Sequence, residues 1–271
     1  MRRSLDRMAL DVSGKILVLL ILAFIILPAL VVTLTAFNDK AILSFPPKAY
    51  SLRWFQRAVE YGDFRKGFWN GLIVTVWASS IALVIGAGFA YALNRYSFPL
   101  KRTLESILLS PLVIPHFTIG LGLLMLSALS GAGRGFPLVV FAHVVLVLPF
   151  VMRSVLISLQ NVDTRLEMAA ASLGASPLRI LLTITLPLLV PGLISGWLFA
   201  AILSFNEFTA TLFVSTQATQ TLPVAMYNYV REYADPTLAA LSVIYIVVTA
   251  AVLSLANAFF GLGKVLNVDG H

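Results

Sequence analysis

Three polar residues interrupt otherwise apolar stretches of this 271-residue chain and are the first candidates for chemistry. His116 lies between Pro115 and Phe117, and the pair Asn206-Glu207 closes a long apolar run. Ionisable groups inside apolar sequence usually face a cavity, where a carboxylate attracts a cation. The alternative for His116 is a neutral imidazole hydrogen-bonded between helices, and for Glu207 it is an ordinary solvated carboxylate. We treat all three residues as candidates for the lining of a solute path.

Motifs for ATP hydrolysis, metal binding and nucleophilic catalysis are missing from the sequence. Lys15 and Lys264 follow a glycine, but an aliphatic residue comes next where a phosphate-binding loop requires Ser or Thr. No Gly-x-Ser-x-Gly elbow occurs, and the lack of cysteine excludes disulfides and thiolate ligands. The three histidines lack the paired spacing of a metal site: His116, His143 and His271. We expect no catalytic residue, metal or cofactor here, so any ATP hydrolysis would require another polypeptide.

Composition indicates a membrane protein that crosses the bilayer several times. Hydrophobic residues make up 59% of the chain and charged residues 11%, and the mean hydropathy is +0.93. Soluble domains carry about a quarter charged residues, so this charge is too low to cover a water-soluble globule. Six apolar segments approach the roughly 20 residues that a bilayer-spanning helix needs. They are approximately Lys15–Phe37, Leu72–Leu93, Leu104–Leu129, Phe136–Met152, Leu186–Phe205 and Thr237–Leu262.

Basic residues flank the apolar segments instead of forming one long cluster. Those beside the first two segments are Arg2, Arg3, Arg7, Arg95, Lys101 and Arg102. The positive-inside rule then predicts that both termini lie in the cytoplasm. We expect a cytoplasmic segment over residues 1–14, a single transmembrane domain over 15–262 and a cytoplasmic tail over 263–271. On this interpretation the net charge of +7 reflects the basic residues that orient the chain in the lipid bilayer. No nucleic-acid partner is expected.

Two outer loops carry aromatic residues. In the first, Asn38–Gly71, the apolar residues among charges predict a short amphipathic helix at the membrane interface. They are Leu52, Trp54, Phe55 and Val59. In the last outer loop, Tyr227, Tyr229 and Tyr233 are interpreted as part of an aromatic belt, the alternative being contact with a delivered ligand or its carrier.

The loop Asn161–Pro187, expected in the cytoplasm, carries the most specific pattern. Thr164 and Glu167 fit a capping box at a helix start. Four apolar residues then recur at helical spacing: Leu166, Ala169, Ala170 and Leu173. Gly174 suits the helix end, and Ser176-Pro177 starts a second helix. Two short helices with one exposed apolar face indicate a protein partner, the alternative being that they pack on their own membrane domain.

This loop resembles the EAA loop of type I ABC importer permeases. The family pattern is Glu-Ala-Ala, three residues, Gly, nine residues, Ile-x-Leu-Pro. Its Glu falls on Met168, while Glu167 stands one residue earlier, so either side chain is a candidate for the polar contact with the partner. The resemblance implies that residues 153–187 form a coupling loop to an ATPase. The implied coupling residues are Glu167, Met168, Ala169, Ala170, Gly174, Ile184, Leu186 and Pro187.

Two further segments, Ser204–Phe208 and Thr221–Pro223, resemble the spermidine/putrescine permease branch, with Asn206 at one of two positions that are often acidic there. The resemblance implies an all-α, six-helix permease fold in a bacterial inner membrane, with both termini inside. Its implied partners are two cytoplasmic ATPase subunits, a second homologous permease and a periplasmic solute-binding protein. The implied cargo is a polyamine or a related small organic amine.

Other functions stay open at this point. Importers of ferric iron, phosphonate or thiamine share the same permease architecture. A secondary carrier driven by an ion gradient is an alternative of a different class, but such carriers commonly show inverted repeats, and none is evident here. A membrane-embedded enzyme or assembly factor is the third alternative. Neither of the last two explains the loop motif.

Overall fold

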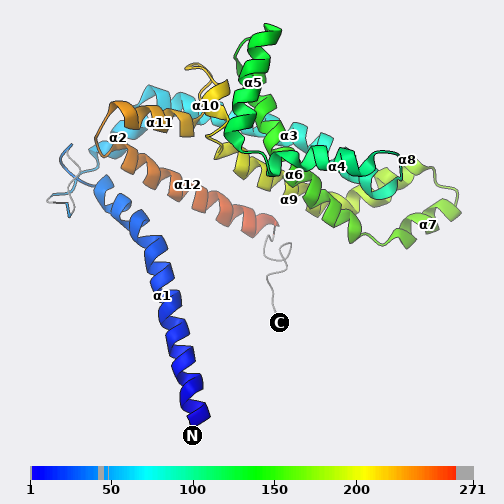
Figure 1. The fold of residues 1–271 in the computed structure, drawn as a ribbon, viewed down its shortest axis with the longest axis horizontal. Coiled ribbons are helices and arrows are strands. Elements are labelled where there is room, and N and C mark those ends of the chain that lie inside the picture. Colours follow the sequence, from blue (N-terminus) through cyan, green and yellow to red (C-terminus); the bar gives the residue numbers. More distant parts are fainter. Residues whose placement is uncertain (1, 42–45, 48, 261–271) are drawn as a thin grey trace. The chain divides into compact units, whose positions relative to one another are not determined.

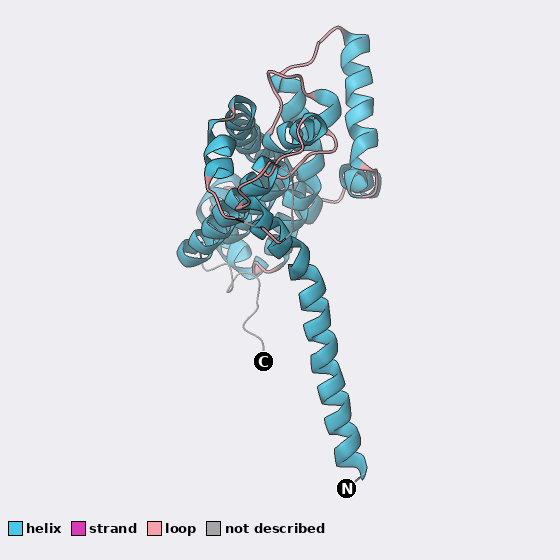
Figure 2. Ribbon diagram, turned by 90° about the vertical axis from the view of Figure 1, so that its left-hand side faces the viewer, coloured by secondary structure: helices cyan, strands magenta, loops and turns pink. Residues whose placement is uncertain are grey.

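The structure, a computed structural model, describes residues 2–41, 46–47 and 49–260, and its regular elements in these ranges are helices joined by loops (Figures 1 and 2). The α-helices are α1 (Arg2–Ala36), α2 (Arg53–Glu60), α3 (Gly62–Arg95), α4 (Lys101–Leu109), α5 (His116–Ser130), α6 (Phe136–Gln160), α7 (Thr164–Ser172), α8 (Pro177–Ile180), α9 (Leu186–Phe205), α10 (Thr211–Val214), α11 (Leu222–Glu232) and α12 (Thr237–Phe260). A 3₁₀ turn, η1 (Ser110–Leu112), follows α4, and a π-helical segment, η2 (Leu181–Thr185), precedes α9. The predicted all-α class is confirmed.

The chain divides into two compact units. The residues up to Tyr61 together with Asn228–Leu255 form the first unit, which holds α1, α2 and most of α12. Residues Gly62–Tyr227 form the body of the second unit, which holds α3 to α10.

Among the residues that the structure describes, four helical stretches are long and apolar enough to cross a bilayer: Ser13–Ala36, Gly62–Arg95, Phe136–Gln160 and Pro177–Phe205. A bent pair, Lys101–Leu112 with His116–Ser130, passes the same test jointly. The apolar stretch Thr237–Ala251 in α12 is shorter, and the last two residues of the sixth predicted segment lie outside the described residues. These helices make the chain a multi-pass membrane protein, while the count of six spans stays a prediction.

The third predicted span, Leu104–Leu129, is wrong as a single helix. Its two halves are separate helices, and the chain bends by 104° between them, around Val113–Pro115. Proline disfavours helical backbone in the preceding residue and cannot donate the next helical hydrogen bond. Pro115 itself has an extended ψ of 135°, and α5 begins at the next residue. The bend places His116 at the start of a new helix instead of in the middle of a span.

The fourth and fifth predicted spans begin or end at the wrong residue. The fourth continues past Met152 to Gln160. The fifth begins before Leu186, because the helix that starts at Pro177 runs through η2 into α9 without a break. The π-helical turn lies directly before Leu186-Pro187, where the proline removes one helical hydrogen bond and crowds the previous turn. The second helix of the loop is therefore continuous with the fifth predicted span.

Small residues let the three long helices of the second unit pack closely. The α3 face of the core includes three fully buried alanines, Ala78, Ala82 and Ala90. Where α9 crosses α6, Gly192 and Gly196 lie against Ser158 and Ser154 respectively. Small residues four apart are the usual means by which helix backbones approach each other in membranes.

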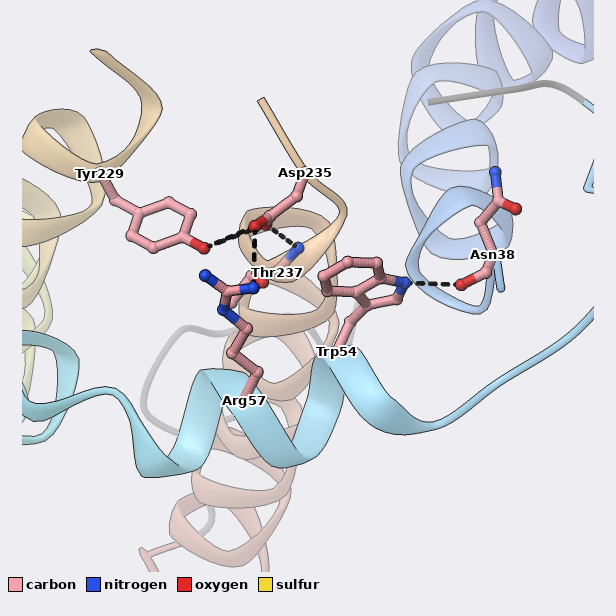
Figure 3. Close-up of polar contacts among 6 residues, drawn as sticks. All are labelled: Asn38, Trp54, Arg57, Tyr229, Asp235 and Thr237. Atoms are coloured by element: carbon pink, nitrogen blue, oxygen red, sulfur yellow. Dashed lines mark hydrogen bonds and ion pairs between the residues drawn. The ribbon is translucent and has the colours of Figure 1, made fainter. Parts of the chain in front are cut away.

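The amphipathic helix expected in the first outer loop is confirmed as α2 in the first unit. Trp54 and Ala58 are its buried residues, and the Trp54 indole N–H donates to the Asn38 carbonyl over 2.6 Å (Figure 3). The Arg57 guanidinium lies 3.5 Å from the Asp235 carboxylate, which also accepts from the Thr237 amide at the start of α12 (Figure 3). These contacts join α2 to the residues that follow α1 and precede α12.

The aromatic-belt interpretation is wrong for Tyr229. This side chain is 1% exposed and donates its hydroxyl to Asp235 over 3.0 Å (Figure 3). Its ring stacks on Tyr233, with 4.6 Å between the ring centroids. Burial raises the pKa of the Tyr229 phenol, which keeps the hydroxyl protonated and able to donate a hydrogen bond. Tyr229 is therefore a buried packing and hydrogen-bonding residue.

Candidate functional site

The loop between α6 and α9 presents an apolar surface that its own chain leaves uncovered. Leu166, Met168 and Leu173 on and just after α7 are 50%, 57% and 88% exposed. None of the residues of α7, all of which the structure describes, is buried. Figure 1 shows α7 and α8 beyond the end of α6 in the second unit. The alternative that these helices pack their apolar face on the second unit itself is therefore not what the structure shows.

The caps of the two loop helices differ in part from those expected. Asp163 precedes α7 and accepts from the Arg165 amide over 2.9 Å, so the Thr164–Glu167 capping box is wrong by one residue at its first position. Both Asp and Thr are good N-cap residues, and the sequence places them side by side. Gly174 has a φ of +84°, and Ser176 accepts from the Arg179 amide to start α8. The glycine end of α7 and the Ser-Pro start of α8 are confirmed.

Glu167 makes contacts that the capping box does not include. Its Oε1 accepts from the Arg95 guanidinium over 2.7 Å and from the Thr185 hydroxyl over 2.6 Å. Arg95 is the last residue of α3, and Thr185 is the last residue of η2. One carboxylate thus joins α7 to the ends of two long helices. The sequence did not reveal this cluster, because Arg95 lies 72 residues before Glu167.

The other residues of the predicted coupling set lie on the same loop and at the start of α9. Ile184 lies in η2, and Leu186 and Pro187 are the first residues of α9. Met168 and Ala169 on α7 are exposed, and Ala170 is half-buried. The structure thus places the set on α7, at its glycine end and at the start of α9. A role for these residues in contacting an ATPase stays a prediction.

A small cavity in the second unit contains two of the three candidate solute-path residues. It has a volume of about 60 Å³, and its lining includes His116, Glu207, His143 and Phe150. The Glu207 carboxylate is 3.7 Å from His116 Nδ1, and its other oxygen accepts from the Ala210 amide. Asn206 is exposed and donates to the Ile202 carbonyl over 2.7 Å. Glu207 is 9% exposed, which rules out the ordinary solvated carboxylate within this chain.

His143 is the polar residue of the cavity that the sequence analysis did not single out. It is 1% exposed in α6, with Nδ1 2.7 Å from the Ser204 hydroxyl and Nε2 2.8 Å from the Thr211 hydroxyl. The Thr211 hydroxyl also donates to the Glu207 carbonyl over 3.4 Å, so the Thr211 oxygen accepts from the Nε2–H of His143. The Nδ1 of His143 then accepts from the Ser204 hydroxyl. His143 thereby ties α6 to α9 and α10. An ionisable residue in the middle of the apolar segment Phe136–Met152 was the available signal.

The polar side chains of the described residues do not gather into a metal-binding group. Within them, no three His, Asp or Glu side chains form a group able to hold an ion. The polar clusters that do occur join helices to one another. The apolar helices and the uncovered loop between α6 and α9 define a class: a multi-pass helical membrane protein with an exposed apolar loop surface.

Comparison with known proteins gives the family. Residues 82–261 match the family described as the inner membrane component of binding-protein-dependent transport systems, and the chain belongs to that family. The spermidine/putrescine transport system permease protein PotC of Haemophilus influenzae is 30% identical over 236 residues, covering 87% of this chain and 91% of the relative. The molybdenum transport system permease protein ModB of Escherichia coli is 36% identical over 186 residues, covering 60% and 80%.

A solved structure supports the same fold. A bacterial ABC transporter involved in the import of the acidic polysaccharide alginate aligns with a TM-score of 0.71 at 17% identity, covering 94% of this chain and 97% of the other. At that identity the likeness concerns the fold alone. Together with the family match, it confirms the predicted type I ABC importer permease. Partners of the ATPase and binding-protein kinds are general to this family.

Proposed function

We propose that this chain is the membrane-spanning permease subunit of an ATP-driven importer in a bacterial inner membrane, and that it has no catalytic activity of its own. Residues 153–187 couple it to two cytoplasmic ATPase subunits, and a second permease subunit and a periplasmic binding protein complete the system. Residues 1–14 and 263–271 are cytoplasmic in this arrangement. The supporting observation is the exposed apolar face of α7 next to the left-handed Gly174. An apolar face that its own chain leaves uncovered favours a protein partner.

Co-purification tests the coupling loop. A tagged chain, expressed in its native membrane, should recover an ATPase subunit, identified by mass spectrometry and ATP hydrolysis. We expect Ala169→Trp and Gly174→Val to lose that subunit, because the first adds bulk to an exposed surface and the second strains a backbone with φ of +84°. Gly62→Val is the matched control, since an added Cβ there meets no atom within 4 Å. Retention of the ATPase in both loop variants would contradict the proposal.

The proposed cargo is a polyamine or a related small organic amine. Glu207 supports it, because a carboxylate that lines a cavity attracts a cation, and the PotC relative is named for spermidine and putrescine. A molybdenum cargo is the second candidate, because the ModB relative is 36% identical and both Glu207 oxygens already have partners within the chain. Uptake of radiolabelled putrescine and of radiolabelled molybdate into cells with and without the gene separates the two.

Replacing Glu207 by glutamine tests its place on the path. The amide oxygen can still accept from the Ala210 amide, so the change removes mainly the charge. We expect amine uptake to fall about tenfold or more, since a charged hydrogen bond is worth roughly 1.5–3 kcal/mol. Recovery of the assembled transporter should be unchanged, as in the control Glu232→Gln, which removes an exposed carboxylate. Unchanged amine uptake in Glu207→Gln would remove Glu207 from the path.

A further inference from the structure

We propose that Glu167 is a positioning residue that fixes α7 to α3 and α9 from within the chain, leaving the docking surface to its neighbours. The inference rests on the proposed function, because it concerns how the coupling loop would transmit a movement to the membrane-spanning helices. The resemblance left both Glu167 and Met168 as candidates for the contact with an ATPase. The structure separates them, since Met168 is 57% exposed while the Glu167 side chain is 17% exposed and already paired.

The geometry around Glu167 supports this role. A single carboxylate oxygen accepts from Arg95 and from Thr185, at 2.7 Å and 2.6 Å. Arg95 and Glu167 are both 17% exposed, and charge-assisted bonds of this length are among the stronger polar contacts. Thr185 is fully buried, so its hydroxyl has little access to water as a substitute partner. Removal of the carboxylate would leave the shielded Arg95 guanidinium and the buried Thr185 hydroxyl without their shared hydrogen-bond acceptor.

The location of the contact explains how it would transmit motion. α7 has no buried residue of its own, so apolar packing holds it only loosely to the second unit. Arg95 ends α3, and Thr185 lies in the π-helical segment that leads into α9. A displacement of α7 by a partner would then act on the ends of two long helices through one carboxylate. Short interface helices that move as rigid elements are a known way of passing a conformational change between subunits.

Spin labels on the full chain test the position of α7 directly. The sequence has no cysteine, so Thr164→Cys at the start of α7 and Phe141→Cys in α6 give one defined label pair within the second unit. Pulsed electron resonance on the chain in lipid nanodiscs reads the distance distribution. We expect a single narrow distribution for the unaltered Glu167 and its loss in Glu167→Ala. Arg165→Ala is the control, because it removes the exposed Asp163–Arg165 pair on the same helix.

A charge exchange separates positioning from general damage. The double variant Glu167→Arg with Arg95→Glu restores an ion pair of opposite direction and should recover the narrow distribution that Glu167→Ala loses. In the complex, Glu167→Ala should keep the ATPase subunit but lose the nucleotide-dependent change in the label distance. If Glu167→Ala leaves the distribution narrow, the inference is wrong; if it also releases the ATPase, Glu167 is a docking residue.

The test distinguishes this inference from the proposed function. Loss of the ATPase in Ala169→Trp reports on docking, whereas the label distance in the isolated chain reports on the Glu167 contact. If Ala169→Trp and Gly174→Val retain the ATPase, the coupling proposal fails whatever the labels show. If those variants lose the ATPase and Glu167→Ala changes nothing, only the positioning role fails. Should Glu167→Ala not yield folded protein, Thr185→Val removes one of the two contacts and should broaden the distribution partially.

Discussion

Adding one methyl group at Gly192 should disrupt the packing of α9 against α6. In Gly192→Ala, the new Cβ would lie 1.8 Å from the Ser158 hydroxyl oxygen and 2.5 Å from its Cβ. Rotation of the serine moves its oxygen but leaves its Cβ in place, so the two helices have to separate. We expect a loss of about 2–3 kcal/mol, in the range of overpacked cores. The measurement is the temperature at which half of the monodisperse protein survives heating in mild detergent.

Two further variants make this prediction specific. Gly88→Ala in α3 places a Cβ with no atom within 4 Å, so it should match or slightly exceed the wild type in stability. The exchange Gly192→Ala with Ser158→Gly removes the obstructing side chain and should regain most of the loss, less about 1 kcal/mol for a glycine inside a helix. If Gly192→Ala is as stable as Gly88→Ala, the close approach of the two helices at this point is wrong.

Much of the helix content was readable from the sequence because long apolar runs have few alternatives in a bilayer. Helices start or end at the predicted residue for Phe136, Phe205 and Thr237. The third segment shows the limit of hydropathy. Its composition is apolar throughout, whereas the bend depends on the backbone at Pro115, which hydropathy does not register. Proline is tolerated inside α6 at Pro149, so its presence alone does not predict a break.

The loop helices were predictable because caps and glycine ends are local features. Gly174 ends one helix and Ser176-Pro177 starts the next through contacts within three or four residues, and the structure confirms both roles. The contacts of Glu167 depend on residues 72 positions before and 18 positions after it, so no local pattern reveals them. The cavity illustrates the same point. His116 and Glu207 could be chosen one by one as ionisable groups in apolar sequence, but their separation of 3.7 Å is a product of the tertiary fold.

Replacing His143 by leucine should destabilise the second unit strongly, because two buried hydroxyl groups each lose their hydrogen bond to the imidazole. Ser204 is 2% exposed and Thr211 is fully buried, so water cannot readily replace the imidazole nitrogens. An unsatisfied buried polar group costs about 1–3 kcal/mol, which gives roughly 2–6 kcal/mol for the pair. Thermal survival of the purified chain in detergent measures the loss. Uptake of the cargo should also fall, because Thr211 and the Glu207 carbonyl belong to the same network.

A compensating variant decides whether hydrogen bonding is the cause. The triple change of His143→Leu, Ser204→Ala and Thr211→Val removes all three partners together, and replacing every member of a polar contact by apolar groups can be nearly neutral. We therefore expect it to recover most of the thermal stability lost in His143→Leu. A triple variant as unstable as His143→Leu would show that the shape of the imidazole matters more than its hydrogen bonds. Recovery of stability without recovery of uptake would show that the polar network serves transport as well as folding, since packing alone would then be insufficient for function.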